Sequence, residues 1–122
     1  MAKLTEDRNT KRRNGDFFGF EAAGRIFTGS LVALDKDGKA VAATADGSCV
    51  VGVAEEGKNA GETVIARRGC FAFDNDESSP LGLADVGSQV VVVDDQTVGK
   101  GDGGAVAGIM LGLDDFGVWV KI

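Results

Sequence analysis

Acidic side chains are the groups in this 122-residue sequence that could most readily hold a metal ion or transfer protons. Asp74, Asp76 and Glu77 could offer carboxylates to a hard cation such as calcium, but a solvated polar loop is the better explanation for them. Asp35–Gly38 begins like a calcium-binding loop, yet its glycine stands at the fourth position instead of the sixth. We therefore predict a hairpin turn at Asp35–Gly38 and no metal site in the chain.

Two adjacent carboxylate pairs, Asp94–Asp95 and Asp114–Asp115, each lie at the end of an expected strand. Successive residues of a strand point to opposite faces, so we do not expect either pair to converge on one substrate. The sequence contains no His, the commonest general base, and no Ser or Cys stands near a plausible base. We predict a protein that is not an enzyme, with no catalytic residue and no cofactor.

A glycine-rich segment, Gly99–Gly104, could cradle a phosphate with its backbone N–H groups. A phosphate-binding P-loop needs Gly-Lys followed by Ser or Thr where a strand meets a helix. Here Gly101 follows Lys100, and no helical pattern comes after it. We therefore predict an irregular loop over residues 96–104 without a phosphate site.

Positive charge is concentrated at the N-terminus. Residues 1–15 carry five basic and two acidic groups, a balance of +3, although the whole chain has a net charge of −6. Few of these residues are apolar, so we predict that 1–16 form a flexible basic arm that docks onto a partner. The acidic body would repel a polyanion, and we predict no nucleic-acid partner. No export signal or membrane-length apolar run is visible, which predicts a soluble chain made in the cytoplasm without a membrane partner.

Apolar and sulfur-containing side chains near the arm and in the body admit more than one interpretation. Phe17, Phe18 and Phe20 either anchor the arm in the domain's own core or fill pockets on a partner. Cys49 and Cys70 are expected to be reduced and buried, with a cross-strand disulfide as the alternative. Trp119 lies in an alternating terminal segment, and we predict that it belongs to the core.

Short β-branched runs separated by glycine and polar residues predict an all-β fold. The run from Ser48 to Phe73 is typical of a long hairpin, and residues 106–122 form a weaker copy of it. Gly52 and Gly61 have counterparts 56 positions later, and the Gly-Ser pair at 29–30 has one 58 positions later. We predict a small β-barrel or β-sandwich over residues 17–122, built from two related hairpin units and preceded by the extended N-terminal arm. Gly61 and Gly117 are expected in turns with positive φ.

These motifs resemble a known family when they are taken in order. The sequence runs from TGSLVAL through VVGVAEEG and AGETVIARRGCF to ADVGSQVVVVDD and a closing GIMLGLDDFGVWVKI. It resembles the capsid decoration, or cement, proteins of tailed bacteriophages, over about Gly24 to Ile122. The matching positions are Gly52, Val53, Gly61, Val64, Gly69, Phe71, Gly108, Ile109, Gly117, Val118 and Val120. The longer basic N-terminal segment departs from this family.

The resemblance implies a structural β-barrel protein on the outer capsid surface of a virion. Such a protein would bridge neighbouring subunits of the major capsid protein, commonly as a homotrimer, and stabilise the mature phage capsid. The capsid-binding residues predicted on this basis are Lys3, Leu4, Arg8, Lys11, Arg12, Arg13, Phe17, Phe18 and Phe20. The alternative is a small β-barrel module of a phage head fibre that binds a receptor or a glycan.

Overall fold

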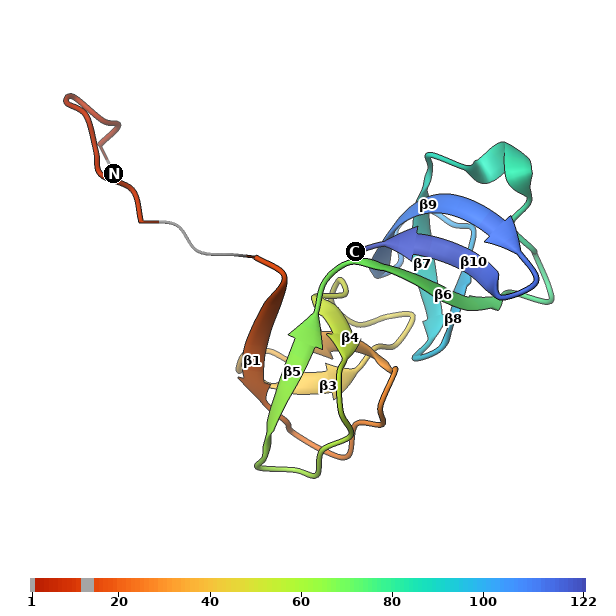
Figure 1. The fold of residues 1–122 in the computed structure, drawn as a ribbon, viewed down its shortest axis with the longest axis horizontal. Coiled ribbons are helices and arrows are strands. Elements are labelled where there is room, and N and C mark those ends of the chain that lie inside the picture. Colours follow the sequence, from red (N-terminus) through yellow and green to blue (C-terminus); the bar gives the residue numbers. More distant parts are fainter. Residues whose placement is uncertain (1, 12–14) are drawn as a thin grey trace.

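The computed structural model describes residues 2–11 and 15–122, and within them it is all-β, as predicted (Figure 1). Residues 2–11 contain no helix or strand. One 3-10 turn, η1 (Leu83–Asp85), interrupts the strands. The strands are β1 (Phe17–Glu21), β2 (Leu31–Leu34), β3 (Ala40–Ala42), β4 (Gly52–Ala54), β5 (Thr63–Arg67), β6 (Cys70–Asn75), β7 (Gln89–Asp94), β8 (Thr97–Gly99), β9 (Val106–Asp114) and β10 (Gly117–Lys121).

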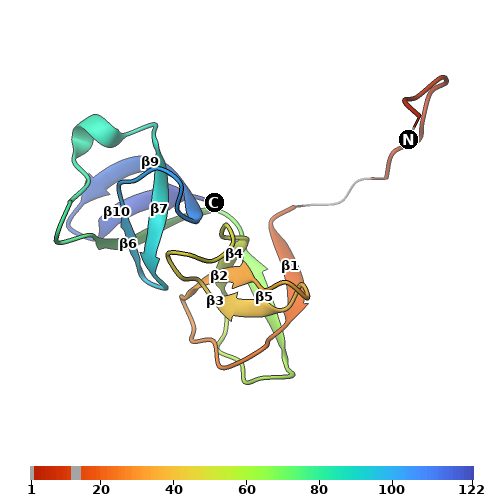
Figure 2. The same cartoon turned by 180° about the vertical axis from the view of Figure 1, so that it is seen from behind.

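The strands form two five-stranded sheets that follow one another along the chain. The first, here called the N-terminal sheet, has the order β1-β5-β4-β2-β3. The second, here called the C-terminal barrel, is closed and has the order β10-β6-β8-β7-β9. The two lie side by side, and the chain passes from β5 in one to β6 in the other (Figures 1 and 2). Gly69, in this link, has a φ of 152°, a value that residues with a Cβ rarely adopt.

The two sheets repeat the same strand pairing. If β1 to β5 are matched in order with β6 to β10, every pair of neighbours in the N-terminal sheet recurs in the C-terminal barrel, which adds the β6–β8 pair. β2 and β3 pair Ala33 with Val41, and 58 positions later β7 and β8 pair Val91 with Gly99. The two hairpin units predicted from the sequence are therefore two copies of one five-stranded arrangement.

Backbone hydrogen bonds around the Gly-Ser pairs repeat as well. Gly29 N–H donates to the Ala54 carbonyl over 2.9 Å, and Gly87 N–H donates to the Met110 carbonyl over 2.8 Å. Both glycines have positive φ, 86° and 92°. A glycine is needed at this position because the turn adopts a conformation that strains any residue with a Cβ.

Closure distinguishes the two copies. β6 and β8 pair in parallel and complete the C-terminal barrel, with Asn75 opposite Val98. At the matching place in the N-terminal sheet there is a single parallel bridge, between Ala22 and Ala40. The N-terminal sheet is thus curled in the same way but joined at only one point.

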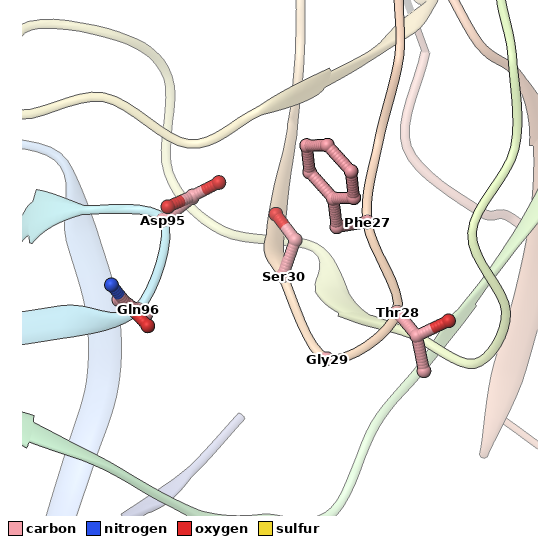
Figure 3. Close-up of a pocket in the computed structure, with 6 residues that line it drawn as sticks. All are labelled: Phe27, Thr28, Gly29, Ser30, Asp95 and Gln96. Carbon is pink, nitrogen blue, oxygen red and sulfur yellow. The ribbon is translucent and has the colours of Figure 1, made fainter.

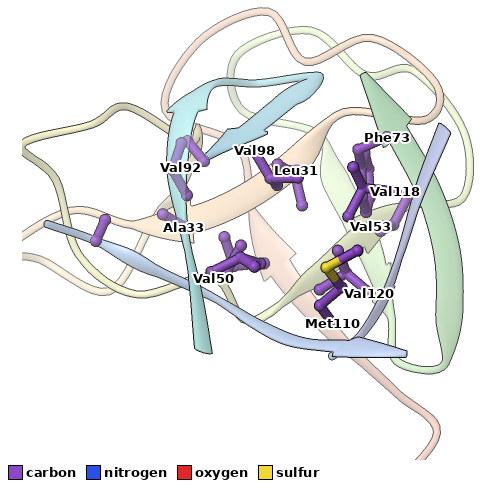
Figure 4. Packing of buried hydrophobic residues seen from close by; sticks show 14 of the residues in the cluster. Leu31, Ala33, Val50, Val53, Phe73, Val92, Val98, Met110, Val118 and Val120 are labelled. Carbon is purple, nitrogen blue, oxygen red and sulfur yellow. The ribbon is translucent and has the colours of Figure 1, made fainter. Parts of the chain in front are cut away.

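Two clusters of buried side chains form the core. The smaller one lies inside the N-terminal sheet and consists of Ala22, Ile26, Val32, Ala40, Ala54, Val64 and Ala66. The larger one fills the C-terminal barrel and also takes in Leu31, Ala33 and Val53 from the N-terminal sheet (Figure 4). Alternation along β2 explains this division, because Val32 points inward while Leu31 and Ala33 point to the opposite face. β2 is therefore buried on both faces and joins the two sheets.

The turn predictions are confirmed and two strand predictions are wrong. The Asp35 carboxylate accepts hydrogen bonds from the N–H groups of Asp37 and Lys39, which fixes the first hairpin turn. Gly61 and Gly117 have φ of 87° and 123°. The predicted hairpin over residues 48–73 ends at β5, because β6 pairs in the other sheet. The loop predicted over residues 96–104 contains β8. This strand is short and ends at a glycine, so its sequence gives little strand signal, and its pairing with β6 and β7 holds it in the sheet.

Three burial predictions are wrong. Cys49 and Cys70 are free and exposed, so they are not buried apolar side chains. Trp119 is half-buried on the outside of β10, because its neighbours Val118 and Val120 take the inward positions. Its indole N–H instead donates to the Asp114 carboxylate over 2.8 Å. No helix in the described part of the chain is long and apolar enough to cross a membrane.

Candidate binding surface

The basic N-terminal segment exposes the side chains that were predicted to make contacts. Lys3, Leu4, Arg8 and Lys11 are exposed, and 69% of Leu4 is accessible. The two other predicted residues of this segment, Arg12 and Arg13, lie outside the described residues. The segment thus offers positive charge and one apolar side chain to its surroundings.

The three phenylalanines of β1 divide between the two interpretations given for them. Phe20 is half-buried and packs against the cluster inside the N-terminal sheet. Phe17 and Phe18 keep 41% and 37% of their surface accessible. One ring therefore anchors β1 in the domain, and two rings contribute to the surface at the point where the basic segment enters the sheet.

An arginine from the neighbouring strand holds the Phe17 ring. Arg67 lies opposite Phe17 in the β1–β5 ladder, with its guanidinium 5.1 Å from the ring centroid. The same guanidinium donates two hydrogen bonds to one Glu55 oxygen, over 2.7 and 3.1 Å. Glu55 fixes Arg67, and Arg67 in turn restricts Phe17, so this part of the surface is ordered before any partner binds.

One end of the C-terminal barrel is strongly acidic. Three turns meet there around a hollow of about 570 Å³ lined by Asp74, Asp76, Glu77, Asp94 and Asp115, among others. Sequence reasoning treated these carboxylates as separate loops, because their convergence depends on the barrel's closure. The Phe116 ring lies at the same hollow and is 79% exposed.

Several of these carboxylates have a structural role in their turns. Asp76 accepts hydrogen bonds from the N–H and hydroxyl of Ser78, and Asp94 accepts one from the Gln96 N–H. Among residues 2–11 and 15–122, no group of three or more Cys, Asp or Glu side chains is arranged to bind a metal ion. The acidic end is a charged surface.

A second hollow, of about 400 Å³, lies where the N-terminal sheet meets the C-terminal barrel (Figure 3). Phe27, Thr28, Gly29 and Ser30 line one side, and Asp95 and Gln96 line the other. Asp94 and Asp95 thus face different hollows, as expected for neighbours at a strand end. Sequence reasoning missed Phe27, although an aromatic residue directly before a Thr-Gly turn was a signal that could have drawn attention to it.

Neither a family model nor a curated protein nor a solved structure matches this chain. Its own residues and their geometry are therefore the basis for assigning a function. The surfaces available for that purpose are the basic segment with β1, the acidic end of the barrel, and the hollow between the sheets.

Proposed function

We propose that this chain is a structural protein of a phage virion that decorates the outer surface of the mature capsid. In this role it binds the major capsid protein as a homotrimer and ties neighbouring capsid subunits together. The resemblance of its glycine and valine pattern to capsid decoration proteins supports the proposal, and so does its all-β fold.

The observation that carries the proposal is the basic segment that leads directly into β1. Its described basic residues, Lys3, Arg8 and Lys11, are exposed, and the strand that follows exposes Phe17 and Phe18. A segment with this composition gains little from folding by itself, so its ordering free energy must come from a partner. An acidic surface on the capsid is the kind of partner that its charge would select.

Repetition of the interface suits a weak individual contact. A trimer that engages one site raises the effective concentration of its other two segments at neighbouring sites. Three modest contacts then give tight attachment, although each alone dissociates readily. A segment that is ordered only on the assembled lattice also restricts binding to the mature shell, because the required surface exists only there.

Co-sedimentation with mature phage heads tests the proposal. The full chain should sediment with the heads, and deletion of residues 2–15 should lower its occupancy at limiting concentration by tenfold or more, since each lost charged or apolar contact contributes about 1 kcal/mol. The deletion should leave the melting temperature unchanged, because these residues precede β1. The matched control is Phe116→Ala, which removes an exposed ring at the far end of the chain.

The outcomes separate clearly. Equal occupancy by the truncated and full chains would show that the basic segment is not part of the interface. Failure of the full chain to bind heads would overturn the decoration function itself. Analytical ultracentrifugation of the free protein tests whether it is a trimer. The number of copies bound per head at saturation tests the same point on the capsid.

A further inference from the structure

The hollow between the two sheets is built around an exposed aromatic ring. Phe27 is 63% accessible, and its ring lies beside Ser30 and opposite Asp95 (Figure 3). Exposing a phenylalanine costs solvation free energy of roughly 1.5–3 kcal/mol relative to burying it. A ring kept at the surface in an otherwise polar hollow offers its flat face to a ligand that itself has an apolar face.

Contacts behind the ring hold it in place. The Arg25 guanidinium lies 4.9 Å from the Phe27 ring centroid, and it donates a hydrogen bond to the Asn59 side-chain oxygen over 3.2 Å. Asn59 is fixed in turn by its N–H, which donates to the Glu62 carboxylate over 2.7 Å. Arg25 covers one face of the ring and does not line the hollow, so the ring presents its remaining surface to the hollow.

The backbone on both sides of the hollow is also fixed. Residues 27–30 form a tight turn in which Ser30 N–H donates to the Phe27 carbonyl over 3.1 Å. The Thr28 hydroxyl oxygen accepts a hydrogen bond from Gly57 N–H over 2.8 Å. Across the junction, Leu31 N–H donates to the Asp95 carbonyl over 2.9 Å, which joins the two sides of the hollow. A ligand would therefore find the site already formed, at a low entropic cost of binding.

Two polar side chains that line the hollow are not used by the fold. The Asp95 carboxylate and the Gln96 amide make no hydrogen bond or ion pair with another described residue through their side chains. Asp95 extends from the β7–β8 turn toward the Phe27 side of the hollow (Figure 3). The carboxylate supplies acceptors only, whereas the amide supplies both a donor and an acceptor.

The repeat of this turn shows that its geometry does not require an aromatic residue. In the C-terminal copy, Ser88 N–H donates to the Asp85 carbonyl over 3.0 Å, in the same way as Ser30 and Phe27. The position of Phe27 is occupied there by Asp85, whose carboxylate pairs with Lys100 at 3.6 Å. The ring at Phe27 is thus an addition to a turn that forms without it.

We propose that this hollow is a binding site for a neutral saccharide. The apolar C–H face of a pyranose ring would pack on Phe27, and two of its hydroxyls would donate to Asp95 while Gln96 donates to a ring or hydroxyl oxygen. A cationic ligand is disfavoured because Arg25 already places a positive charge on the ring. An anionic ligand such as a nucleotide is disfavoured by the Asp95 carboxylate. The site does not depend on capsid attachment and would be present in a free chain.

Titration with single sugars, followed by backbone amide NMR shifts, tests this site. The probes are glucose, galactose, mannose, N-acetylglucosamine and rhamnose, each added to the full chain. At least one is expected to give saturable shifts at millimolar concentration, confined to Gly29, Ser30, Gln96 and their neighbours. Phe27→Ala should weaken that binding by roughly three- to tenfold, the value of one aromatic contact. Asp95→Asn should weaken it as well, because the amide offers one acceptor oxygen in place of two.

Controls separate loss of the site from loss of the fold. Phe27→Leu keeps an apolar side chain but removes the flat ring, and Phe116→Ala removes an exposed ring elsewhere. Phe27→Leu should weaken sugar binding with an unchanged melting temperature, while Phe116→Ala should leave binding unaltered. Absence of saturable shifts with every sugar would overturn the proposal, and so would an affinity of the Phe27→Ala and Asp95→Asn variants equal to that of the native chain. Methylammonium chloride serves as the cationic probe, and tighter binding of that ion than of any sugar would also overturn it.

Discussion

The N-terminal sheet and the C-terminal barrel share a strand order and a register but are filled differently. Ala40, Ala54 and Ala66 line the inside of the N-terminal sheet, and the residues paired in the same way in the barrel are Val98, Met110 and Val120. The same ladder of backbone hydrogen bonds therefore encloses either a small or a larger interior. The two copies share their glycine turns and pairing register, whereas they differ in the volume of the enclosed side chains and in how completely the sheet closes.

The outer faces of the two sheets also differ, and here the N-terminal sheet has the more deeply buried side chains. Leu31 and Val53 of the N-terminal sheet are buried against the barrel, whereas their counterparts are Gln89, which is exposed, and Ile109, which is half-buried. The N-terminal sheet compensates for a small interior with a second buried face, in the way that strands covered on both sides are apolar throughout. It depends on the barrel more than the barrel depends on it.

The largest expected effect comes from the face shared by the two sheets. Leu31→Ala should lower the free energy of unfolding by about 2–5 kcal/mol, because Leu31 is fully buried and the cavity cannot be filled by rigid strands. Gln89→Ala, at the matching position of the barrel, should change it by no more than about 0.5 kcal/mol. Urea denaturation followed by Trp119 fluorescence measures both. Similar losses for the two variants would show that the outer faces are equivalent after all.

Matched glycines sharpen the comparison of the two closing turns. Gly61→Ala introduces only the strain of a positive φ, about 1–2 kcal/mol, since nothing lies near the added Cβ. Gly117→Ala adds a collision with the Phe73 carbonyl of the paired strand, so the destabilisation should be larger, about 3 kcal/mol or more. Thermal melts of the two variants decide the order, and a Gly61 variant that melts at the lower temperature would contradict this prediction.

The smallest expected effect on stability concerns the place where the N-terminal sheet is joined by one bridge, between Ala22 and Ala40. A hydrogen bond to Glu21, over 2.9 Å, and the charge of that carboxylate raise the pKa of Lys39 above its ordinary value of about 10.5. The stabilisation from this exposed pair is therefore fully present below about pH 10.5 and is lost as the pH rises through the raised pKa. The barrel has Asp74 opposite Thr97 at the matching place and no such ion pair.

A pH series tests this contribution. The melting temperature of the native chain should exceed that of Glu21→Gln slightly near neutral pH, and the difference should disappear as the pH rises through the raised pKa of Lys39. A melting-temperature difference that stays constant across this range would assign the effect of Glu21 to something other than its pairing with Lys39.

The extent to which sequence predicted this molecule follows from the range of each interaction. Gly61, Gly117 and the Asp35 turn were predictable, because positive φ and short-range side-chain hydrogen bonds are set by neighbouring residues. The pseudo-repeat was visible in glycine spacing alone. The transfer of β6 to the second sheet was not, since Cys70 to Asn75 reads like any other strand and its partner β10 lies far along the chain.

The candidate sites show the same division. The exposed basic segment could be inferred from composition, but the acidic end of the barrel and the hollow at Phe27 depend on turns brought together by closure and by the packing of two sheets. The prediction for Trp119 was wrong because alternation along β10 shows only that successive side chains face opposite sides of the strand. It does not show which set faces the core, and in the structure Val118 and Val120 do.

Ile122 exchanges backbone hydrogen bonds with Gly69, in both directions, beside the link between the two sheets. A pulling force applied at residue 122 would therefore act on the joint between the two sheets. The same force applied at residue 16 would act on β1, the outermost strand of the N-terminal sheet. In a single-molecule unfolding experiment, the point of attachment would thus decide whether the joint or the edge strand yields first.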